Sequence, residues 1–176
     1  MPRPPRPTAA GIYHVAVTAP SAGKLFADAE DRLRFTAELA RTTLFEHWTC
    51  ICFCLLTTHY HLVVDVDDGA LPRTMKKLNW QYARSVNARR EGRGHVVGGR
   101  YLSVPVSDTD HLLTVFRYVA RNPVEAGLCR QPQAWPWSSY AGSVGLERGF
   151  TFVDSAIVLE SFAGRVESLR DFVEGV

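Results

Sequence analysis

Residues 48–66 constrain the fold most, because they hold two strand-like runs separated by only two residues. The run over residues 48–56 is apolar at nearly every position, which is typical of a central strand buried on both faces. The run over residues 59–66 is rich in β-branched residues, which favour strands. Thr57 and Thr58 allow only a tight connection, so the two strands should pair antiparallel. We therefore expect an antiparallel sheet built around this hairpin.

Two histidines begin the second of these strands, in the order His59-Tyr60-His61. Side chains at i and i+2 leave the same face of a strand, so His59 and His61 should point one way and Tyr60 the other. Two neutral imidazoles can hold one divalent ion and leave most of its coordination shell open for a phosphate oxygen and water. The pattern is short and common, so the alternative is a pair of partly buried histidines at a strand edge.

Periodic patterns along the rest of the chain predict the other elements. Alternation predicts strands over residues 11–18 and 100–106. Helical spacing predicts helices over residues 28–48 and 71–90, and a third from Asp108 or Asp110 to about residue 121, ended by Asn122-Pro123. Two short helices are expected over residues 154–162 and 166–173.

Two of the predicted helices carry an apolar stripe. The first, with Asp28 as its candidate N-cap, should bury Leu33, Ala37, Ala40, Leu44 and Phe45. The second should bury Leu71, Met75, Leu78, Tyr82 and Val86.

The predicted order of elements is strand, helix, strand, strand, helix, strand, which defines an α+β, ferredoxin-like antiparallel sheet (βαββαβ) with helices on one face. The first and third strands are then central neighbours, and the third helix is the element most able to lie across the His59 and His61 face. His14 shares a face of its strand with Ile12 and Ala16 and could approach the pair. A lone strand histidine can equally be structural.

Tyr118 and Asn122 stand four residues apart on the third helix and so share a face. A phenol is a poor nucleophile at neutral pH, but a metal-bound phosphate is a better electrophile and a nearby cation favours the phenolate. Asn122 could add an oxygen ligand. The alternative is that Tyr118 is a half-buried aromatic residue and Asn122 ends the helix before the proline.

Basic residues are concentrated in one part of a chain whose formal net charge is only +2. Residues 73–100 contain one acid, Glu91, and eight basic residues: Arg73, Lys76, Lys77, Arg84, Arg89, Arg90, Arg93 and Arg100. Such a segment suggests a face that binds a polyanion, or else a solvated surface helix. Trp80, within it, could stack on a base, although a tryptophan beside an apolar stripe can also belong to the core.

Composition excludes several classes of protein. The longest apolar run, residues 51–56, is too short to cross a bilayer, and residues 1–10 form a basic, proline-rich arm without the apolar region of a signal peptide. That arm is interpreted as a disordered end or as an arm touching nucleic acid.

Cys50, Cys52 and Cys54 alternate along one strand, which suits neither disulfides nor a closed zinc site. They are therefore interpreted as small buried residues in a reducing cytoplasm.

Taken together, the ordered motifs resemble those of the REP-associated tyrosine transposases, a bacterial branch of the single-tyrosine HUH transposases. The similarity covers about residues 11–145. The matching segments are Gly11-Ile-Tyr-His-Val15, Thr58-His-Tyr-His-Leu62, Leu78-Asn79 with Tyr82-Ala83 and Asn87, Gly94-His95 with Gly99-Arg100-Tyr101, Tyr118-Val-Ala-Arg-Asn-Pro-Val124 with Ala126-Gly127-Leu128, and Trp135-Pro-Trp-Ser-Ser-Tyr140.

The resemblance implies a fold of the HUH nuclease type, with an added tyrosine-bearing helix and a short helical C-terminal tail over residues 146–176. It implies that His59 and His61 are metal ligands for Mg²⁺ or Mn²⁺, with Asn122 as the third, and that Tyr118 is the nucleophile that forms a 5′-phosphotyrosine link. The implied substrate is single-stranded DNA near palindromes that fold into hairpins. The DNA-binding residues are then expected to be Arg73, Lys76, Lys77, Trp80, Arg84, Arg89, Arg90 and Arg100.

The sequence departs from the family pattern without losing a proposed catalytic side chain. Thr57-Thr58 stands where Pro-Asn is usual, and Val96-Val97-Gly98 replaces an aromatic residue and a glutamine. One alternative is a domesticated hairpin-binding protein with little or no cleavage activity. Another is a phosphoesterase that uses water in place of Tyr118. Family-like enzymes can exchange the Tyr118 helix between the subunits of a homodimer, and the sequence leaves open whether that helix packs on its own chain or on a partner's. A location in the bacterial cytoplasm, at the nucleoid, is also expected from the family.

Overall fold

The computed structural model describes residues 8–20, 23–46, 48–91 and 95–175. Most of the expected N-terminal arm, residues 1–7, lies outside the described residues, as do Arg93 and Gly94. No helix within the described ranges is long and apolar enough to cross a membrane.

Four antiparallel strands form one sheet, in the order β2-β3-β1-β4. They are β1 (Gly11–Thr18), β2 (Trp48–Leu55), β3 (His59–Val66) and β4 (Leu102–Pro105). The expected hairpin of β2 and β3 is confirmed, and so is the central pairing of β1 with β3. The β1–β3 register sets Thr18 opposite His59 and Ala16 opposite His61.

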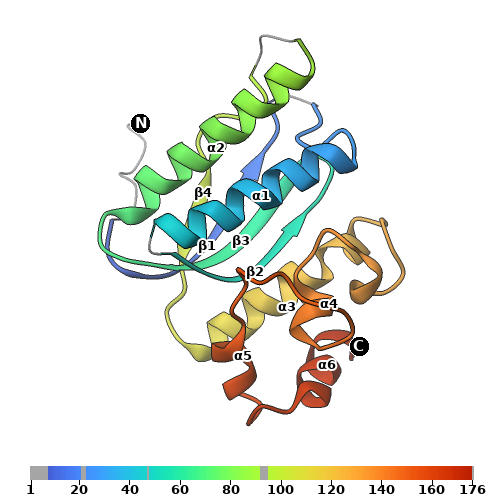
Figure 1. Ribbon diagram of the computed structural model, residues 1–176. Coiled ribbons are helices and arrows are strands. Elements are labelled where there is room, and N and C mark those ends of the chain that lie inside the picture. The colour runs from blue at the N-terminus through green and yellow to red at the C-terminus, as the bar shows by residue number, and fades with distance from the viewer. Residues whose placement is uncertain (1–7, 21–22, 47, 92–94, 176) are drawn as a thin grey trace, which may run out of the picture.

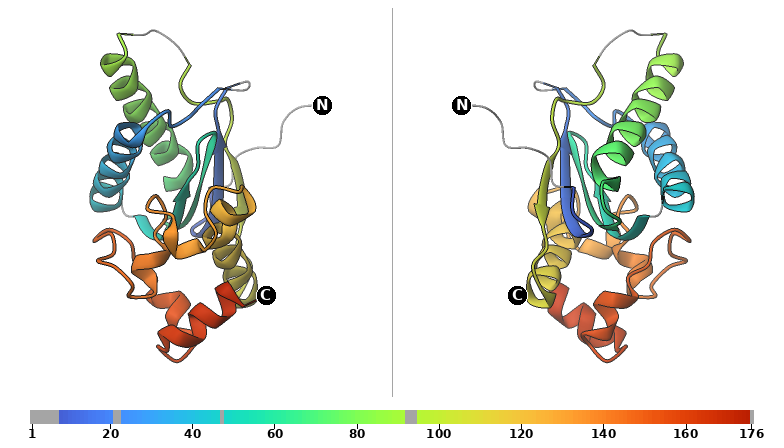
Figure 2. Two further views of the ribbon diagram at one scale, coloured as in Figure 1. Left: turned by 90° about the vertical axis from the view of Figure 1, so that its right-hand side faces the viewer. Right: turned by 90° about the vertical axis from the view of Figure 1, so that its left-hand side faces the viewer.

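Helices cover both faces of this sheet (Figure 1). The two long helices α1 (Ala29–Phe45) and α2 (Ala70–Arg89) lie on one face, and α3 (Thr109–Glu125) lies on the other, as the side views show (Figure 2). Four short helices follow α3: η1 (Pro132–Ala134), α4 (Tyr140–Ser143), α5 (Ala156–Glu160) and α6 (Val166–Glu174). The predicted α+β fold with a ferredoxin-like sheet is confirmed.

Alternation along β1 and β3 divides the apolar residues between two cores. Tyr13, Val15 and Tyr60 belong to the core beneath α1 and α2. Val63 belongs to the second core, which contains the buried residues of α3. His61 shares the face of Val63, so the two histidines of β3 lie on the α3 side of the sheet.

The apolar stripe predicted for α1 is wrong, whereas the stripe predicted for α2 and the Asp28 N-cap of α1 are confirmed. Leu33, Leu44 and Phe45 are exposed, and the buried face of α1 is built instead from Asp31, Arg32, Phe35, Thr36, Leu39 and Thr42. The charged residues buried here lie beside partners from other elements. The guanidinium of Arg32, for example, lies 5.7 Å from the ring centroids of both Trp135 and Trp137.

β2 is an edge strand, not a central one as predicted. Its apolar character reflects cover on its outer edge as well as on both faces. Leu55 N–H donates to the Trp137 carbonyl at 2.9 Å, and Ser139 N–H donates to the Phe53 carbonyl at 3.0 Å. Later segments of the chain thus satisfy backbone groups that an open edge would expose.

α3 continues through Asn122-Pro123, where the sequence predicts its end, and stops at Glu125. A proline lacks the N–H that would bond four residues back, which costs one hydrogen bond near the last turn. The Asn122 carbonyl still accepts the N–H of Ala126 at 2.9 Å, so the turn closes. Tyr118 and Asn122 are consequently both inside the helix.

The segment after residue 146 packs against α3. Arg117 donates to the Gly175 carbonyl at 2.7 Å and Arg121 donates to the Val173 carbonyl at 3.1 Å. The Tyr140 hydroxyl donates to Glu174 at 2.7 Å. These contacts connect the last helix, α6, to the helix that carries Tyr118.

Candidate active site

The two histidines of β3 form the start of the candidate site. Their ring centroids lie 5.1 Å apart and their planes are nearly perpendicular, at 89°. His61 is only 5% exposed, whereas His59 is half-buried at the end of the strand. Tyr60 points to the opposite core, where its hydroxyl donates to Asn79 Oδ1 at 2.7 Å. The predicted division of this tripeptide between two faces is confirmed.

A third histidine, His14, joins the pair from the neighbouring strand β1. Its Nε2 lies 3.0 Å from His61 Nδ1, and the two rings stack with centroids 5.2 Å apart. In the β1–β3 register His14 faces Val63, so its contact with His61 is a diagonal one across the strand pair. The sequence allowed this approach but did not distinguish His14 from a structural histidine, since pairing register is not visible in a single strand.

Tyr118 of α3 completes a cluster of four rings. Its ring meets His61 edge-on at a centroid distance of 5.3 Å and His14 at 5.8 Å. The side chain remains 42% exposed, although the neighbouring Val119 is buried in the second core. The helix that bears Tyr118 lies against the sheet of its own chain, so one chain supplies all four rings.

Asn122, the predicted third ligand, is buried one turn beyond Tyr118. Among the described residues, its side chain makes no hydrogen bond with the histidines. No three His, Cys, Asp or Glu side chains form a metal-holding group within the described ranges. A metal ion here would rely on two imidazoles and on oxygen atoms from elsewhere.

Burial keeps the inner histidines neutral. Burial first, and then the proximity of His14 and His59, lowers the pKa of His61 to about 3. The pKa of His14 is also lowered, chiefly by burial and then by His111. Neutral imidazoles retain the lone pair that a metal ion needs.

Two ring nitrogens have environments that fit a divalent ion. His61 Nε2 is buried and has no hydrogen-bond partner in the described part of the chain. His59 Nδ1 lies 3.0 Å from the Thr58 hydroxyl, which leaves Nε2 as the ring nitrogen available for another partner. A ligand would account for this unpaired buried nitrogen.

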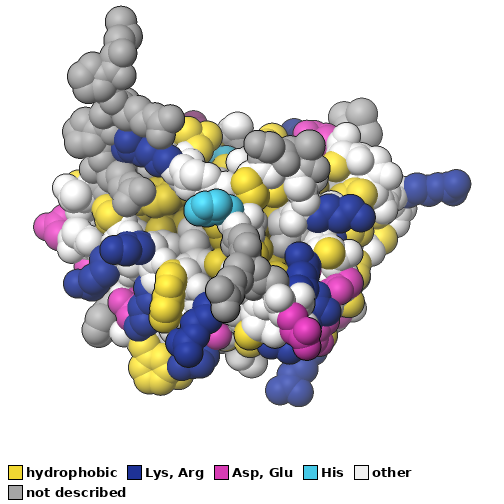
Figure 3. Space-filling view, turned by 90° about the horizontal axis from the view of Figure 1, so that it is seen from above, with side chains coloured by type: hydrophobic (Ala, Val, Ile, Leu, Met, Phe, Trp, Pro, Cys, Tyr) yellow, Lys and Arg dark blue, Asp and Glu magenta, His cyan; other side chains and the backbone are white. Residues whose placement is uncertain are grey.

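The predicted DNA-binding residues fall into two groups, and most of them lie on α2, across the sheet from Tyr118. Four of them are paired with acids of α1 or its flanks: Arg73 and Lys77 with Glu46, Arg89 with Asp28 and Asp31, and Arg90 with Asp31. Viewed from above, Lys and Arg side chains lie around the molecule with acidic side chains beside several of them (Figure 3). These pairs hold α1 against α2 and reduce the charge offered to a polyanion.

Lys76, Trp80, Arg84 and Arg100 form the second group and are exposed. Trp80 is 58% exposed, so the alternative that it belongs to the core is wrong. The Arg84 guanidinium lies 5.4 Å from the Trp80 ring centroid. This pair presents an aromatic face beside a cation, an arrangement on which a base can stack.

A groove of about 550 Å³ lies between this part of α2 and residues 95–101. Lys76, Asn79, Trp80 and His95 contribute to its walls. Gly98 fixes the second wall, because its N–H donates to the Thr18 carbonyl at 2.8 Å. Since Thr18 is the strand partner of His59, the groove and the histidines meet at the same end of the sheet.

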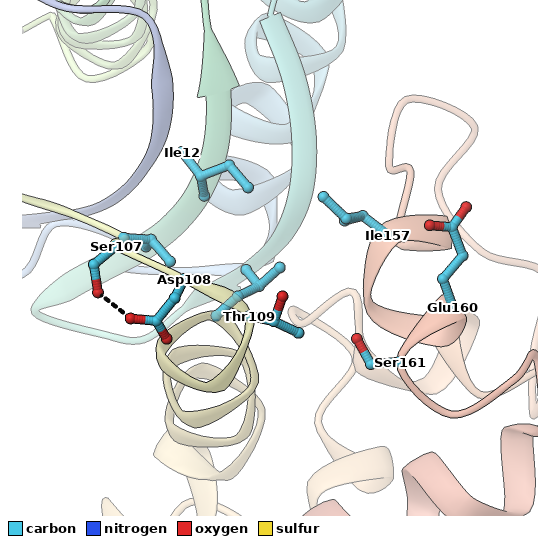
Figure 4. Close-up of a pocket in the computed structure, with 9 residues that line it drawn as sticks. Ile12, Ser107, Asp108, Thr109, Ile157, Glu160 and Ser161 are labelled. Carbon is cyan, nitrogen blue, oxygen red and sulfur yellow. Dashed lines mark hydrogen bonds between the residues drawn. The ribbon is translucent and has the colours of Figure 1, made fainter.

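A second cavity, of about 510 Å³, lies between the start of α3 and α5 and contains none of the predicted site residues (Figure 4). Of its two carboxylates, Asp108 and Glu160, Asp108 is already satisfied. It accepts from the Ser107 hydroxyl at 2.6 Å and from the His111 N–H at 2.9 Å, where it caps α3.

No protein family model matches the chain, and no curated protein matches it in sequence. A solved structure, described as that of the REP-associated tyrosine transposase bound to a REP hairpin, superposes with a TM-score of 0.72. The match covers 88% of this chain and 98% of the transposase chain, at 14% sequence identity. At this identity the comparison supports the family resemblance at the level of fold.

Proposed function

We propose that this protein is a single-stranded DNA strand transferase that cleaves and rejoins DNA near hairpin-forming palindromes. The observation that carries the proposal is the position of the Tyr118 ring against His61 and His14, beside the unpaired Nε2 of His61. A nucleophile-bearing side chain and neutral metal-ligand side chains on one surface suit phosphoryl transfer. The solved hairpin-bound transposase of the same fold gives the class of DNA substrate.

The residues of the cluster have separate roles in this proposal. The Tyr118 hydroxyl gives its proton to water and attacks the scissile phosphorus. A bond from Tyr118 Oη to phosphorus forms, the bond to the 3′ oxygen breaks, and the 3′ oxygen takes up a proton from water. The 5′ end stays on the enzyme as a phosphotyrosine. A later 3′-hydroxyl can attack that linkage and release Tyr118, which rejoins the strands.

His59 and His61 would hold a divalent ion, Mg²⁺ or Mn²⁺, with Asn122 as the third protein ligand if its side chain turns toward them. The ion, when bound, would supply positive charge to the phosphate oxygens and to the phenolate. Imidazole is a softer ligand than the oxygen donors that Mg²⁺ prefers, so Mn²⁺ should support the reaction at lower concentrations than Mg²⁺.

Single-stranded DNA would reach this cluster through the groove beside Trp80. Lys76, Arg84 and Arg100 are exposed cations, and the groove ends where Gly98 contacts Thr18. A strand bound there would pass the end of the sheet to reach His59 on the other face. Replacing Trp80 by alanine should weaken single-strand binding about 5- to 150-fold, the range for loss of one stacked base, whereas Trp80→Phe should retain most of it.

A covalent-complex assay tests the proposed function. The protein would be incubated with labelled single-stranded oligonucleotides that carry a hairpin, in Mn²⁺ or in EDTA, and run on a denaturing gel. We expect an adduct that requires Mn²⁺ and is absent from Tyr118→Phe. Tyr13→Phe is the matched control, because the Tyr13 hydroxyl only donates to the Ala9 carbonyl.

A hairpin-binding protein without cleavage activity is the second candidate. It is favoured because, among the described residues, no group of three His, Cys, Asp or Glu side chains could hold a metal ion, and hairpin binding needs none. Metal-independent binding with no adduct would establish it. Cleavage that persists in Tyr118→Phe would instead favour a phosphoesterase that uses water.

A further inference from the structure

We propose that His14 is a positioning residue for His61: it accepts a hydrogen bond from His61 Nδ1–H and so holds His61 in the tautomer whose Nε2 lone pair is free to bind a divalent ion. His14 itself is not a metal ligand in this account. The inference rests on the proposed function, because it needs an ion at His61.

The hydrogen bond joins ring nitrogens on two neighbouring strands of the sheet. His14 Nε2 and His61 Nδ1 are 3.0 Å apart, on the two central strands of the sheet. The rings are stacked at an interplanar angle of 26°, and Tyr118 packs edge-on against both. Neither ring can turn away from the other without disturbing the contact with Tyr118.

Only one proton can lie between two neutral imidazoles, and its position decides what His61 can do. If His14 donated it, His61 would carry its own proton on Nε2, and a buried N–H would be left without an acceptor in the described part of the chain. If His61 donates it, Nε2 presents a bare lone pair. The second arrangement avoids an unsatisfied buried donor and prepares a ligand atom.

The arrangement follows a general pattern of metal sites. A ligating histidine usually donates its other ring N–H to an acceptor, which fixes the tautomer and the ring orientation. Carboxylates and carbonyls are the common acceptors; here a neutral imidazole from the adjacent strand takes that place. His59 has a comparable partner in the Thr58 hydroxyl, 3.0 Å from its Nδ1.

The tautomer can be measured without metal or DNA. Nitrogen-15 chemical shifts of the histidine side chains, recorded in EDTA at mildly alkaline pH, distinguish a protonated from a bare ring nitrogen. We expect His61 in the wild-type protein to be protonated on Nδ1 and bare on Nε2. A His61 protonated on Nε2 overturns the proposal.

Metal affinity then tests the consequence. Mn²⁺ binding, followed by the loss of the free-ion electron paramagnetic resonance signal, should be about 10- to 100-fold weaker in His14→Phe, the usual effect of removing such a partner. His14→Gln can place an acceptor oxygen near the lost Nε2 and should restore most of the affinity. His111→Gln, a control on α3 that does not touch His61, should bind like the wild type. Unchanged affinity in His14→Phe, or failure of His14→Gln to differ from it, contradicts the proposal.

The two measurements separate this inference from the proposed function. If wild-type His61 has the expected tautomer but the protein binds no Mn²⁺ even with DNA present, the proposed function fails, although the hydrogen bond from His61 to His14 is confirmed. If Mn²⁺ binds tightly and His61 has the other tautomer, the proposed function survives and the role of His14 is refuted. If His14→Phe does not fold, the nitrogen-15 spectrum of the wild-type protein still determines the tautomer of His61.

Discussion

At the scale of single residues, His61 combines deep burial with an unpaired ring nitrogen. Only 5% of the residue is exposed, and three aromatic rings, from His14, His59 and Tyr118, surround it. Water cannot compensate for a positive charge at such a position, so the neutral form is favoured. A neutral buried histidine lowers the free energy of unfolding at acidic pH, but its free lone pair favours metal binding.

Stability should therefore depend on pH through His61. Its pKa is about 3 in the folded protein against an ordinary value of 6.5, so between these values the unfolded chain binds a proton that the folded chain does not. The free energy of unfolding should fall as pH decreases through this window, with His61 contributing up to about 1.4 kcal/mol per pH unit.

Urea unfolding in EDTA at a series of pH values measures this slope. In His61→Gln the slope between about pH 6 and pH 4 should be shallower than in the wild type. The exposed His95 provides the control, since His95→Gln should leave the slope unchanged. A wild-type slope identical to that of His61→Gln would show that His61 is protonated in the folded protein.

At the scale of elements, Thr18 at the end of β1 contacts both Gly98 in the wall of the groove and, as its strand partner, His59. A Cβ added to Gly98 would lie 2.4 Å from the Thr18 carbonyl oxygen and 2.9 Å from the Ala19 backbone, distances that require the backbone to shift. At the adjacent Gly99, a Cβ would meet nothing within 4 Å. The wall of the groove therefore requires a glycine at position 98 but not at position 99.

Gly98→Ala should move residues 95–101 away from β1 and weaken the binding of single-stranded DNA, by at least about 5-fold if one stacked base is lost. Gly99→Ala is the matched control and should bind as the wild type does. Fluorescence anisotropy with a labelled oligonucleotide measures both affinities. Equal affinities in the two variants would show that DNA does not use this groove.

The ion pairs between α1 and α2 should contribute to the stability of the fold. Asp31 is fully buried and accepts from Arg89 at 2.6 Å, from Arg90, and from the Ala27 N–H at 2.8 Å. Asp31→Asn should lower the free energy of unfolding by about 2 to 3 kcal/mol, because charge-assisted hydrogen bonds to partly exposed arginines are lost.

Glu30→Gln is the control for Asp31→Asn. Glu30 is half-exposed and pairs with Arg34 on the helix surface at 2.8 Å, so its loss should cost no more than about 0.5 kcal/mol. Chemical denaturation of both variants gives the comparison. Equal costs would mean that the α1–α2 contact does not depend on the buried carboxylate.

At the scale of the whole molecule, the sheet separates the two groups of residues to which functions are proposed. The basic helix α2 lies on one face, and Tyr118 on α3 lies on the other (Figure 2). The C-terminal helix α6 holds α3 through the bonds of Arg117 and Arg121 to its last turn. In this structure one chain brings the histidines and the tyrosine together.

A mixing experiment tests whether one chain is sufficient. If His61 and Tyr118 act within the same chain, a mixture of His61→Gln and Tyr118→Phe should form no covalent DNA adduct, because neither chain has a complete site. An exchanged Tyr118 helix would restore up to about one quarter of the wild-type adduct in such a mixture, by random pairing of subunits. Adduct at that level contradicts the single-chain account.

Much of this fold follows from residue patterns. Alternation predicts β1 and β3 correctly because each strand has one face in each core, and the α2 stripe is correct because its buried residues are apolar. The α1 stripe fails because Asp31 and Arg32 are buried through long-range partners. The edge position of β2 was missed because segments far along the chain cover it.

The candidate site was predictable only in part, because local geometry fixes some of its contacts and the assembled fold fixes the others. The spacing of His59 and His61 places them on one face, which depends only on local geometry. The approach of His14 and Tyr118 depends on strand register and on the packing of α3, which are properties of the assembled sheet. The pairing of Arg89 and Arg90 with Asp31 likewise could not be read from their positions along the chain.

The central claim is that Tyr118 becomes covalently joined to DNA, and peptide mapping of the adduct tests it most directly. Trypsin cleaves after Arg117 and Arg121, so Tyr118 falls in a four-residue peptide, residues 118–121. After reaction with a hairpin oligonucleotide in Mn²⁺ and digestion with nuclease and trypsin, mass spectrometry should find this peptide carrying a nucleotide phosphate on Tyr118. A nucleotide on any other residue, or DNA cleavage with residues 118–121 unmodified throughout the reaction, would contradict the account.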